Sequence, residues 1–224
     1  MNIRLIIFDF DGTLGDTRRN IVMTLQQAMQ EMHLPVIGEA QCAATIGLTL
    51  KNSFKTLFPQ LTDEETEECA ATYRRIFEVN KKKMVPQLFP HVAETLAELK
   101  RRGITMSVAS SRSNASLRGF LNDMGIQQFI SYVLGAEDVT KPKPDPEPVL
   151  KTLSALGFAA DATLVVGDMP VDILMGRNAG TRTTNADRLA VHQYPKTSSS
   201  ERRRMGAIFS RLSMSSSRSS PRMR

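Results

Sequence analysis

Close to its start the chain reads Arg4-Leu5-Ile6-Ile7-Phe8-Asp9-Phe10-Asp11-Gly12-Thr13-Leu14, and these residues predict the class of its fold. The run from Leu5 to Phe8 is apolar throughout and too short for a helix, which is typical of a strand covered on both faces of a parallel sheet. Asp9 therefore stands at the carboxyl end of a buried strand. Open α/β sheets bind their ligands at that edge.

Two carboxylates, Asp9 and Asp11, follow this strand one residue apart, and Gly12 lets the backbone turn close to a ligand. Such a pair can hold Mg²⁺ and leave one carboxylate as a nucleophile and the other as an acid/base. A calcium loop of the EF-hand type does not fit, because its glycine is the sixth residue and Gly12 is only the fourth from Asp9. Magnesium chemistry and a simple acidic turn both stay open at this point.

The composition is that of an ordinary globular chain of 224 residues, with 41% hydrophobic residues and a mean hydropathy of −0.22. This length can bury one sizeable core and a smaller module. No apolar run approaches the roughly 20 residues of a membrane span, and the start of the chain lacks the features of a signal peptide. We therefore expect a cytoplasmic protein in which Cys42 and Cys69 are buried thiols without a disulfide or metal.

The net charge of +6 comes entirely from the end of the chain. Residues 182–224 contain ten Lys and Arg against two Asp and Glu, whereas residues 1–181 contain 19 basic and 21 acidic residues. The globular part therefore gives no reason to expect nucleic acid or a membrane as a partner.

Between residues 17 and 84 the pattern is helical, with apolar residues three and four apart and no strand signal. Thr62 to Glu65 has the form of a capping box that opens a long charged helix to about Asn80. From His91 onward, helices alternate with apolar strands at 104–109, 132–134 and 163–166. This order predicts an α/β fold with a Rossmann-like, mostly parallel sheet, and three segments: a core of residues 1–16 and 85–181, an all-helical cap of residues 17–84, and a tail of residues 182–224.

Each later strand is followed by polar residues that meet Asp9 at the same edge of the predicted sheet: Ser110 and Ser111, then Lys141, then Asp168 and Asp172. A hydroxyl, an ammonium and several carboxylates are what phosphoryl transfer requires, because charge spreads over the phosphoryl oxygens in its transition state. Each residue alone has a simpler explanation. Ser110 can cap a helix, Lys141 can be a solvated lysine, and Gly167-Asp168 is a common turn.

Together, four segments resemble the signature motifs of the haloacid dehalogenase-like hydrolase superfamily: Asp9 to Leu14, Ser110, Lys141-Pro142, and Gly167 to Asp172. The helical cap between the first two is similar to that of the phosphoglycolate phosphatase and β-phosphoglucomutase branch. The resemblance covers residues 1 to about 181.

The resemblance implies a Mg²⁺-dependent phosphatase that forms an aspartyl-phosphate on Asp9, with Asp11 as the acid/base. The acid at position 11 favours a phosphatase over a dehalogenase. It also implies that the phosphate is bound by Ser110, Ser111, Lys141 and Gly12, and that Lys141 offsets the charge on Asp9. The implied metal ligands are Asp9, Asp11 (through its carbonyl) and Asp168. Asp172 is implied to orient Lys141.

The expected substrate is a small phosphate monoester, with 2-phosphoglycolate as the first guess, acted on by a monomer or homodimer. The motifs do not separate a phosphatase from a sugar-phosphate mutase of the β-phosphoglucomutase type. A catalytically silent regulatory member and a basic tail that binds nucleic acid or membrane are further hypotheses. Complete motifs argue against the former and a tail poor in aromatic residues against the latter.

The tail departs from the family pattern, in which a fifth strand and a helix should follow Gly180. Residues 182–224 contain ten serines and nine arginines and no alternating apolar pattern. The composition predicts disorder from about Thr184 onward, and a shifted reading frame is the simplest hypothesis for it. Without a further strand, residues 163–166 would form an exposed edge of the sheet.

Overall fold

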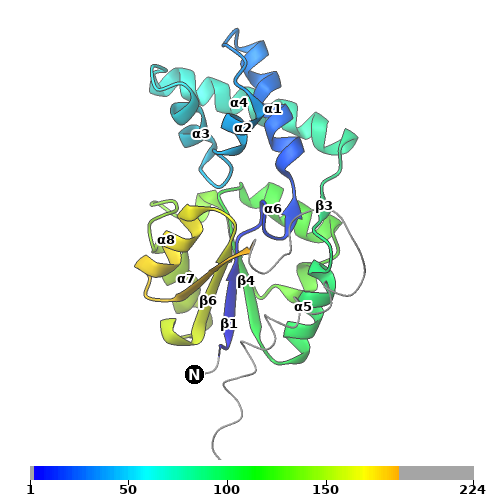
Figure 1. The fold of residues 1–224 in the computed structure, drawn as a ribbon, viewed down its shortest axis with the longest axis vertical. Helices are drawn as coiled ribbons and strands as arrows, with labels where there is room; N and C mark the ends of the chain where they lie inside the picture. Colours follow the sequence, from blue (N-terminus) through cyan, green and yellow to red (C-terminus); the bar gives the residue numbers. More distant parts are fainter. Residues whose placement is uncertain (1–2, 187–224) are drawn as a thin grey trace, which may run out of the picture.

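The computed structural model describes residues 3–186 and confirms the predicted α/β class. One parallel sheet has the strand order β5-β4-β1-β6-β7, of which β4, β1 and β6 are seen side by side in Figure 1. Its strands are β1 (Leu5–Phe8), β4 (Thr105–Ala109), β5 (Tyr132–Leu134), β6 (Thr163–Gly167) and β7 (Arg182–Asn185). Because β1 lies in the middle of this order, Asp9 follows the central strand.

Alternate residues of β1 serve two different hydrophobic clusters, as the two-residue period of a strand requires. Ile6 and Phe8 pack with residues of the helices on one face, and Leu5 and Ile7 pack with those on the other. All four side chains are buried. The continuous apolar run is therefore explained by burial on both sides of the sheet.

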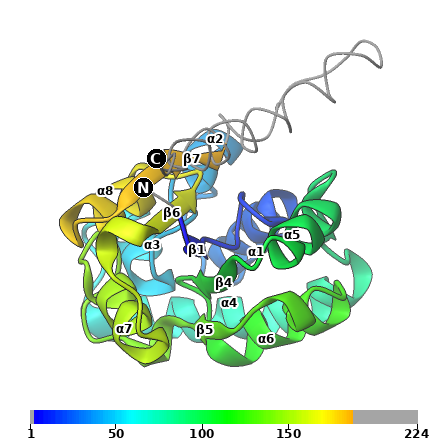
Figure 2. The ribbon, with the colours of Figure 1, turned by 90° about the horizontal axis from the view of Figure 1, so that it is seen from below.

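Helices cover both faces of the sheet, with α5 and α6 on one side and α7 and α8 on the other (Figure 2). Their bounds are α5 (Val92–Arg101), α6 (Asn114–Asp123), α7 (Glu147–Leu156) and α8 (Pro170–Asn178), with short 3₁₀ turns η1 (Gln127–Phe129), η2 (Ala136–Asp138) and η3 (Ala160–Ala162). Gly103, Gly125, Gly157 and Gly180 each follow one of these helices, and all four have positive φ.

Four helices lie together at the carboxyl edge of the sheet and have a hydrophobic cluster of their own (Figure 1). They are α1 (Arg18–Glu31), α2 (Glu39–Ala43), α3 (Leu50–Leu57) and α4 (Asp63–Lys83). The capping box at the start of α4 is present: Glu65 N–H donates to Thr62 Oγ1 and Thr62 N–H donates to the Glu65 carboxylate. The helix continues three residues beyond the predicted end at Asn80.

The chain enters and leaves these helices through a short antiparallel pair that the sequence pattern did not indicate. β2 (Gly15–Asp16) pairs with β3 (Gln87–Leu88). A second connection is made by side chains, since Phe77 of α4 belongs to the hydrophobic cluster of the sheet domain. Residues 17–84 are therefore joined to the sheet by two strands and by packing at one end of α4.

The expectation that no strand follows Gly180 is wrong. Strand β7 pairs in parallel with β6, and Ala186 after it is buried in the main hydrophobic cluster. The strand escapes a search for apolar alternation because its residues are polar and only half buried. β6 is thus an interior strand, and the core extends past residue 181. The predicted disorder concerns mainly residues 187–224, which lie outside the described residues.

Among residues 3–186, no helix is long and apolar enough to cross a membrane.

Candidate active site

Asp9 forms a buried ion pair with a lysine, and both side chains are only 3% exposed. Lys143 Nζ donates to Asp9 Oδ1 at 2.5 Å and to Asp172 Oδ1 at 2.7 Å. The other Asp172 oxygen accepts from Met169 N–H at 3.1 Å. Asp172 is therefore fixed at both oxygens and holds Lys143 against Asp9.

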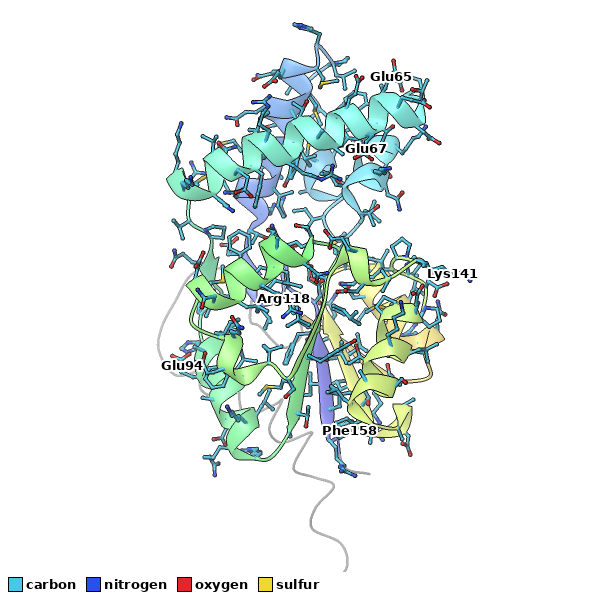
Figure 3. All side chains as sticks on the ribbon, turned by 180° about the vertical axis from the view of Figure 1, so that it is seen from behind. Glu65, Glu67, Glu94, Arg118, Lys141 and Phe158 are labelled. Carbon is cyan, nitrogen blue, oxygen red and sulfur yellow. The ribbon has the colours of Figure 1, made fainter. Side chains whose placement is uncertain are left out.

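Lys141, which the sequence predicts to lie beside Asp9, does not lie there, so this prediction is wrong. Lys141 is exposed and lies at the outer edge of the molecule (Figure 3), where its backbone N–H donates to Glu147 at 2.7 Å. Lys143 occupies the expected position instead. Because Lys141 and Lys143 both follow β5 in a proline-rich loop and both precede a proline, their sequence context does not distinguish them.

Asp168 completes a cluster of three carboxylates at the ends of β1 and β6. Asp9, Asp168 and Asp172 each offer one oxygen atom, and these atoms lie within 4.8 Å of one another. Thr13 Oγ1 donates to Asp168 at 3.3 Å. Gly12 has a φ of +81°, and a Cβ atom there would lie 2.2 Å from an Asp168 oxygen, so only glycine lets the loop pass this carboxylate.

The cluster fits a divalent cation. Three carboxylates face the single ammonium of Lys143, which leaves an excess of negative charge. Asp9 Oδ2 is buried without a hydrogen-bond partner among the described residues, although such atoms are normally satisfied. Oxygen-only ligands of this kind suit Mg²⁺. Asp9 and Asp168 are the natural ligands, because both Asp172 oxygens already accept hydrogen bonds.

Burial and the close approach of like charges shift the pKa values of this cluster. Burial raises the pKa of Asp9 well above its usual range, and the carboxylates of Asp172, Asp11 and Asp168 add to this while Lys143 opposes it. Burial and the Asp172 carboxylate raise the pKa of Asp168 to about 6. Burial lowers the pKa of Lys143, but Asp172 and Asp9 outweigh it and keep this pKa above its usual value. A cation would stabilise the ionised carboxylates.

Asp11 lies beside this cluster and is held by different partners. Its Oδ1 atom accepts from Thr17 Oγ1 at 2.6 Å and from Arg112 Nε and Nη2, both at 2.8 Å. Thr17 precedes α1 and Arg112 follows β4, so one residue next to the four helices and one next to the sheet hold this carboxylate. Neither residue was assigned a role from the sequence.

The two serines after β4 have different surroundings. Ser110 is buried, its Oγ accepts from Arg112 N–H at 3.2 Å, and it lines a small cavity of about 10 Å³ together with Lys143. Ser111 Oγ instead donates to the Gly47 carbonyl at 2.6 Å. Gly47 belongs to the loop between α2 and α3, so Ser111 links the helical domain to the sheet.

A cavity of about 500 Å³ lies between helices α1, α3 and α4 and the edge of the sheet. On the side of the sheet it is lined by Asp11, Ser111 and Arg112. Its apolar lining comes from Ile21, Leu25, Ile46, Leu48, Leu50, Tyr73 and Phe77. The cavity thus adjoins the expected acid/base and has room for a group much larger than a water molecule.

Sequence reasoning missed Lys143, Arg112 and Thr17. Lys143 follows Lys141 in the segment Lys141-Pro142-Lys143-Pro144, and choosing between the two lysines would have required the path of that loop. Arg112 directly follows the two serines, but an arginine after a strand is by itself a common surface residue. Its position against Asp11 depends on contacts between residues 101 apart in the chain.

Comparison with known proteins agrees with this geometry. A family model described as haloacid dehalogenase-like hydrolase matches residues 6–186. A probable phosphatase IndB from Dickeya dadantii is 38% identical over 79% of this chain and 77% of its own length. Phosphoglycolate phosphatase of Photorhabdus laumondii is 32% identical over 80% and 77%, and pyrophosphatase PpaX of Halalkalibacterium halodurans is 32% identical over 82% and 83%.

Solved structures show the same architecture. A haloacid dehalogenase-like hydrolase from Bacteroides fragilis superposes with a TM-score of 0.78 at 29% identity, covering 82% of this chain and 87% of that one. The fold extends to CbbY from Rhodobacter sphaeroides, with a TM-score of 0.70 at 18% identity, covering 82% and 85%.

Proposed function

The chain belongs to the haloacid dehalogenase-like hydrolases, and from this premise we propose that it is a Mg²⁺-dependent phosphatase of small phosphate monoesters. The observation that carries the proposal is the buried arrangement of Asp9 with Lys143, Asp168 and Asp172 beside Asp11. The names of the relatives, which include a phosphoglycolate phosphatase and a pyrophosphatase, agree with the reaction class.

The first step in this proposal is attack by the Asp9 carboxylate on phosphorus. An aspartyl-phosphate bond forms as the ester P–O bond breaks. Lys143 lies at hydrogen-bond distance from Asp9 Oδ1 and can balance charge on the phosphoryl oxygens, and Ser110 lines the same small cavity. Bound to Asp9 and Asp168, Mg²⁺ would supply further stabilisation of that charge.

In this proposal Asp11 exchanges the protons of the reaction. It lines the cavity in which the alcohol part of the substrate would lie. In the first step it gives a proton to the departing oxygen, and in the second it takes one from the water that hydrolyses the aspartyl-phosphate. This assigns the nucleophile and the acid/base to two carboxylates of different surroundings.

Replacing the nucleophile tests the mechanism. Asp9→Asn should abolish the Mg²⁺-dependent release of phosphate from p-nitrophenyl phosphate, because no aspartyl-phosphate forms. Asp11→Ala should lower kcat about 10²- to 10⁴-fold, the usual contribution of acid–base catalysis, because hydrolysis of the aspartyl-phosphate needs Asp11 as a base. Both are measured against wild type with Mg²⁺ and with EDTA. Full activity of Asp9→Asn, or of wild type in EDTA, contradicts the proposal.

The substrate itself is best found with a panel of metabolites. We propose 2-phosphoglycolate and pyrophosphate as the first compounds, because relatives carry the corresponding names. The cavity of about 500 Å³ also justifies larger sugar and alcohol phosphates. Release of inorganic phosphate supports a phosphatase, whereas isomerisation of a sugar phosphate without release would identify a mutase.

A further inference from the structure

Arg112 is almost completely enclosed, with 9% of its side chain exposed. The centre of its guanidinium lies 4.7 Å from the ring of Phe120, 5.1 Å from Phe77 and 6.0 Å from Phe10. Aromatic faces at such distances attract a cation and restrict its movement. Phe77 comes from α4 of the helical domain and the other two rings from the sheet domain, so Arg112 is held at the junction of the two.

The polar edge of this guanidinium is directed at one atom. Nε and Nη2 both lie 2.8 Å from Asp11 Oδ1, and Nη1 donates to Ser116 Oγ at 3.0 Å. Thr17 Oγ1 is a third donor to Oδ1, at 2.6 Å. Within residues 3–186 these donors all meet Oδ1, which leaves Asp11 Oδ2 as the oxygen that can carry the exchanged proton.

We propose that Arg112 is a positioning residue for Asp11 and that Phe77 keeps it in place. This inference rests on the phosphatase function proposed above. As the bond from Asp9 to phosphorus forms and the ester P–O bond breaks, the bonding electron pair goes to the departing oxygen, which takes the proton from Asp11 Oδ2. Arg112 fixes the carboxylate so that this oxygen faces the substrate, and misplacement of a catalytic group by about 1 Å can cost 10²-fold.

A role in binding the phosphoryl group is the competing explanation for an arginine here. The hydrogen bonds do not favour it, since Nε and Nη2 are directed at Asp11, Nη1 at Ser116, and the planar face is covered by rings. The two roles predict different dependence on the leaving group. A positioning residue matters only when the departing oxygen needs a proton.

Two esters with aromatic leaving groups make this comparison. The p-nitrophenolate ion leaves without protonation, whereas the benzyl alkoxide requires a proton. For Arg112→Gln, we expect kcat/KM for benzyl phosphate to fall about 10- to 100-fold, part of the full acid–base contribution. For p-nitrophenyl phosphate, kcat/KM should change less than about threefold, because this quantity ends at formation of the aspartyl-phosphate.

Three further variants make the result decisive. Arg118→Gln removes an exposed arginine from the same helix as Ser116 (Figure 3) and should leave both substrates unchanged. In an Asp11→Asn background, Arg112→Gln should add no further loss with benzyl phosphate, because the proton donor is already gone. Phe77→Leu, which keeps an apolar side chain but removes the ring, should show a smaller loss of the same selectivity.

Equal losses on both esters, or additive losses in the Asp11→Asn background, would overturn the positioning role and favour phosphoryl binding. If Arg112→Gln does not fold, as judged by circular dichroism, Arg112→Lys replaces it. Its loss of kcat/KM should again be larger for benzyl phosphate than for p-nitrophenyl phosphate. Lysine keeps the positive charge but cannot donate two hydrogen bonds in the fixed geometry of a guanidinium. Failure of wild type to hydrolyse either ester would instead refute the phosphatase proposal itself.

Discussion

Lys143 and Lys141 are two residues apart and have opposite surroundings, which makes them a matched pair. Lys143→Met should lower kcat/KM for p-nitrophenyl phosphate about 10²- to 10³-fold, because it removes a preorganised cation at the reacting group. Lys141→Met should stay within about twofold of wild type, since its side chain is exposed. Steady-state kinetics with matched circular dichroism spectra give the answer. Comparable losses in the two variants would show that Lys143 has no special role.

At the scale of single residues, the sequence predicts best those carboxylates that directly follow an apolar strand. Asp9, Asp11 and Asp168 follow strands that the apolar runs identify, and the structure brings them together at one edge. The lysine was misplaced because two candidates shared one motif. Arg112 could not be predicted, since its significance comes from Asp11 and three rings that are distant in the chain.

At the scale of elements, the main wrong prediction is that no strand follows Gly180, where the structure has β7. Apolar periodicity finds strands buried on both faces, such as β1, whereas β7 consists of Arg182, two threonines and Asn185 and is stabilised by its pairing with β6. By contrast, helix α4 was predicted well because its capping box and helical period are local properties of the sequence. Pairing between distant segments is what the sequence alone did not reveal.

Two truncations measure the contribution of β7. A chain that ends at Ala186 should unfold at a higher temperature than one that ends at Gly180. The shorter chain loses the four residue pairs with β6 and the buried Ala186, and it exposes the edge of β6 beside Asp168. Thermal unfolding followed by circular dichroism compares them. Identical midpoints would mean that β7 contributes nothing to stability.

At the scale of the whole molecule, pH and metal are linked through the carboxylate cluster. The pKa of Asp168 is raised from 3.8 to about 6, so between these pH values the folded metal-free chain holds a proton that the unfolded chain has released. Stability without metal therefore falls as pH rises through this window. Mg²⁺ binds the ionised carboxylate, so its affinity should rise over the same range.

The corresponding measurement is the shift in Tm on adding Mg²⁺. We expect a larger increase at about pH 7 than at about pH 5, because binding to the folded state stabilises it more as occupancy rises. Asp168→Asn is the control, and it should show little response to Mg²⁺ at either pH. An equal Tm shift for wild type at both pH values would contradict the link between ionisation of Asp168 and binding of Mg²⁺.

The position of β1 in the sheet also determines when the protein can fold during synthesis. Leu5 pairs with Thr105 on one side and with Thr163 on the other. At the usual ribosomal speed of about 5–20 residues per second, the central strand waits several seconds for its first neighbour. Helices α1 to α4, whose own hydrophobic cluster lies within residues 18–83, emerge complete in that interval. The nascent chain can thus bury this helical cluster while β1 is still an unpaired apolar strand, the state in which assistance by a chaperone would matter most.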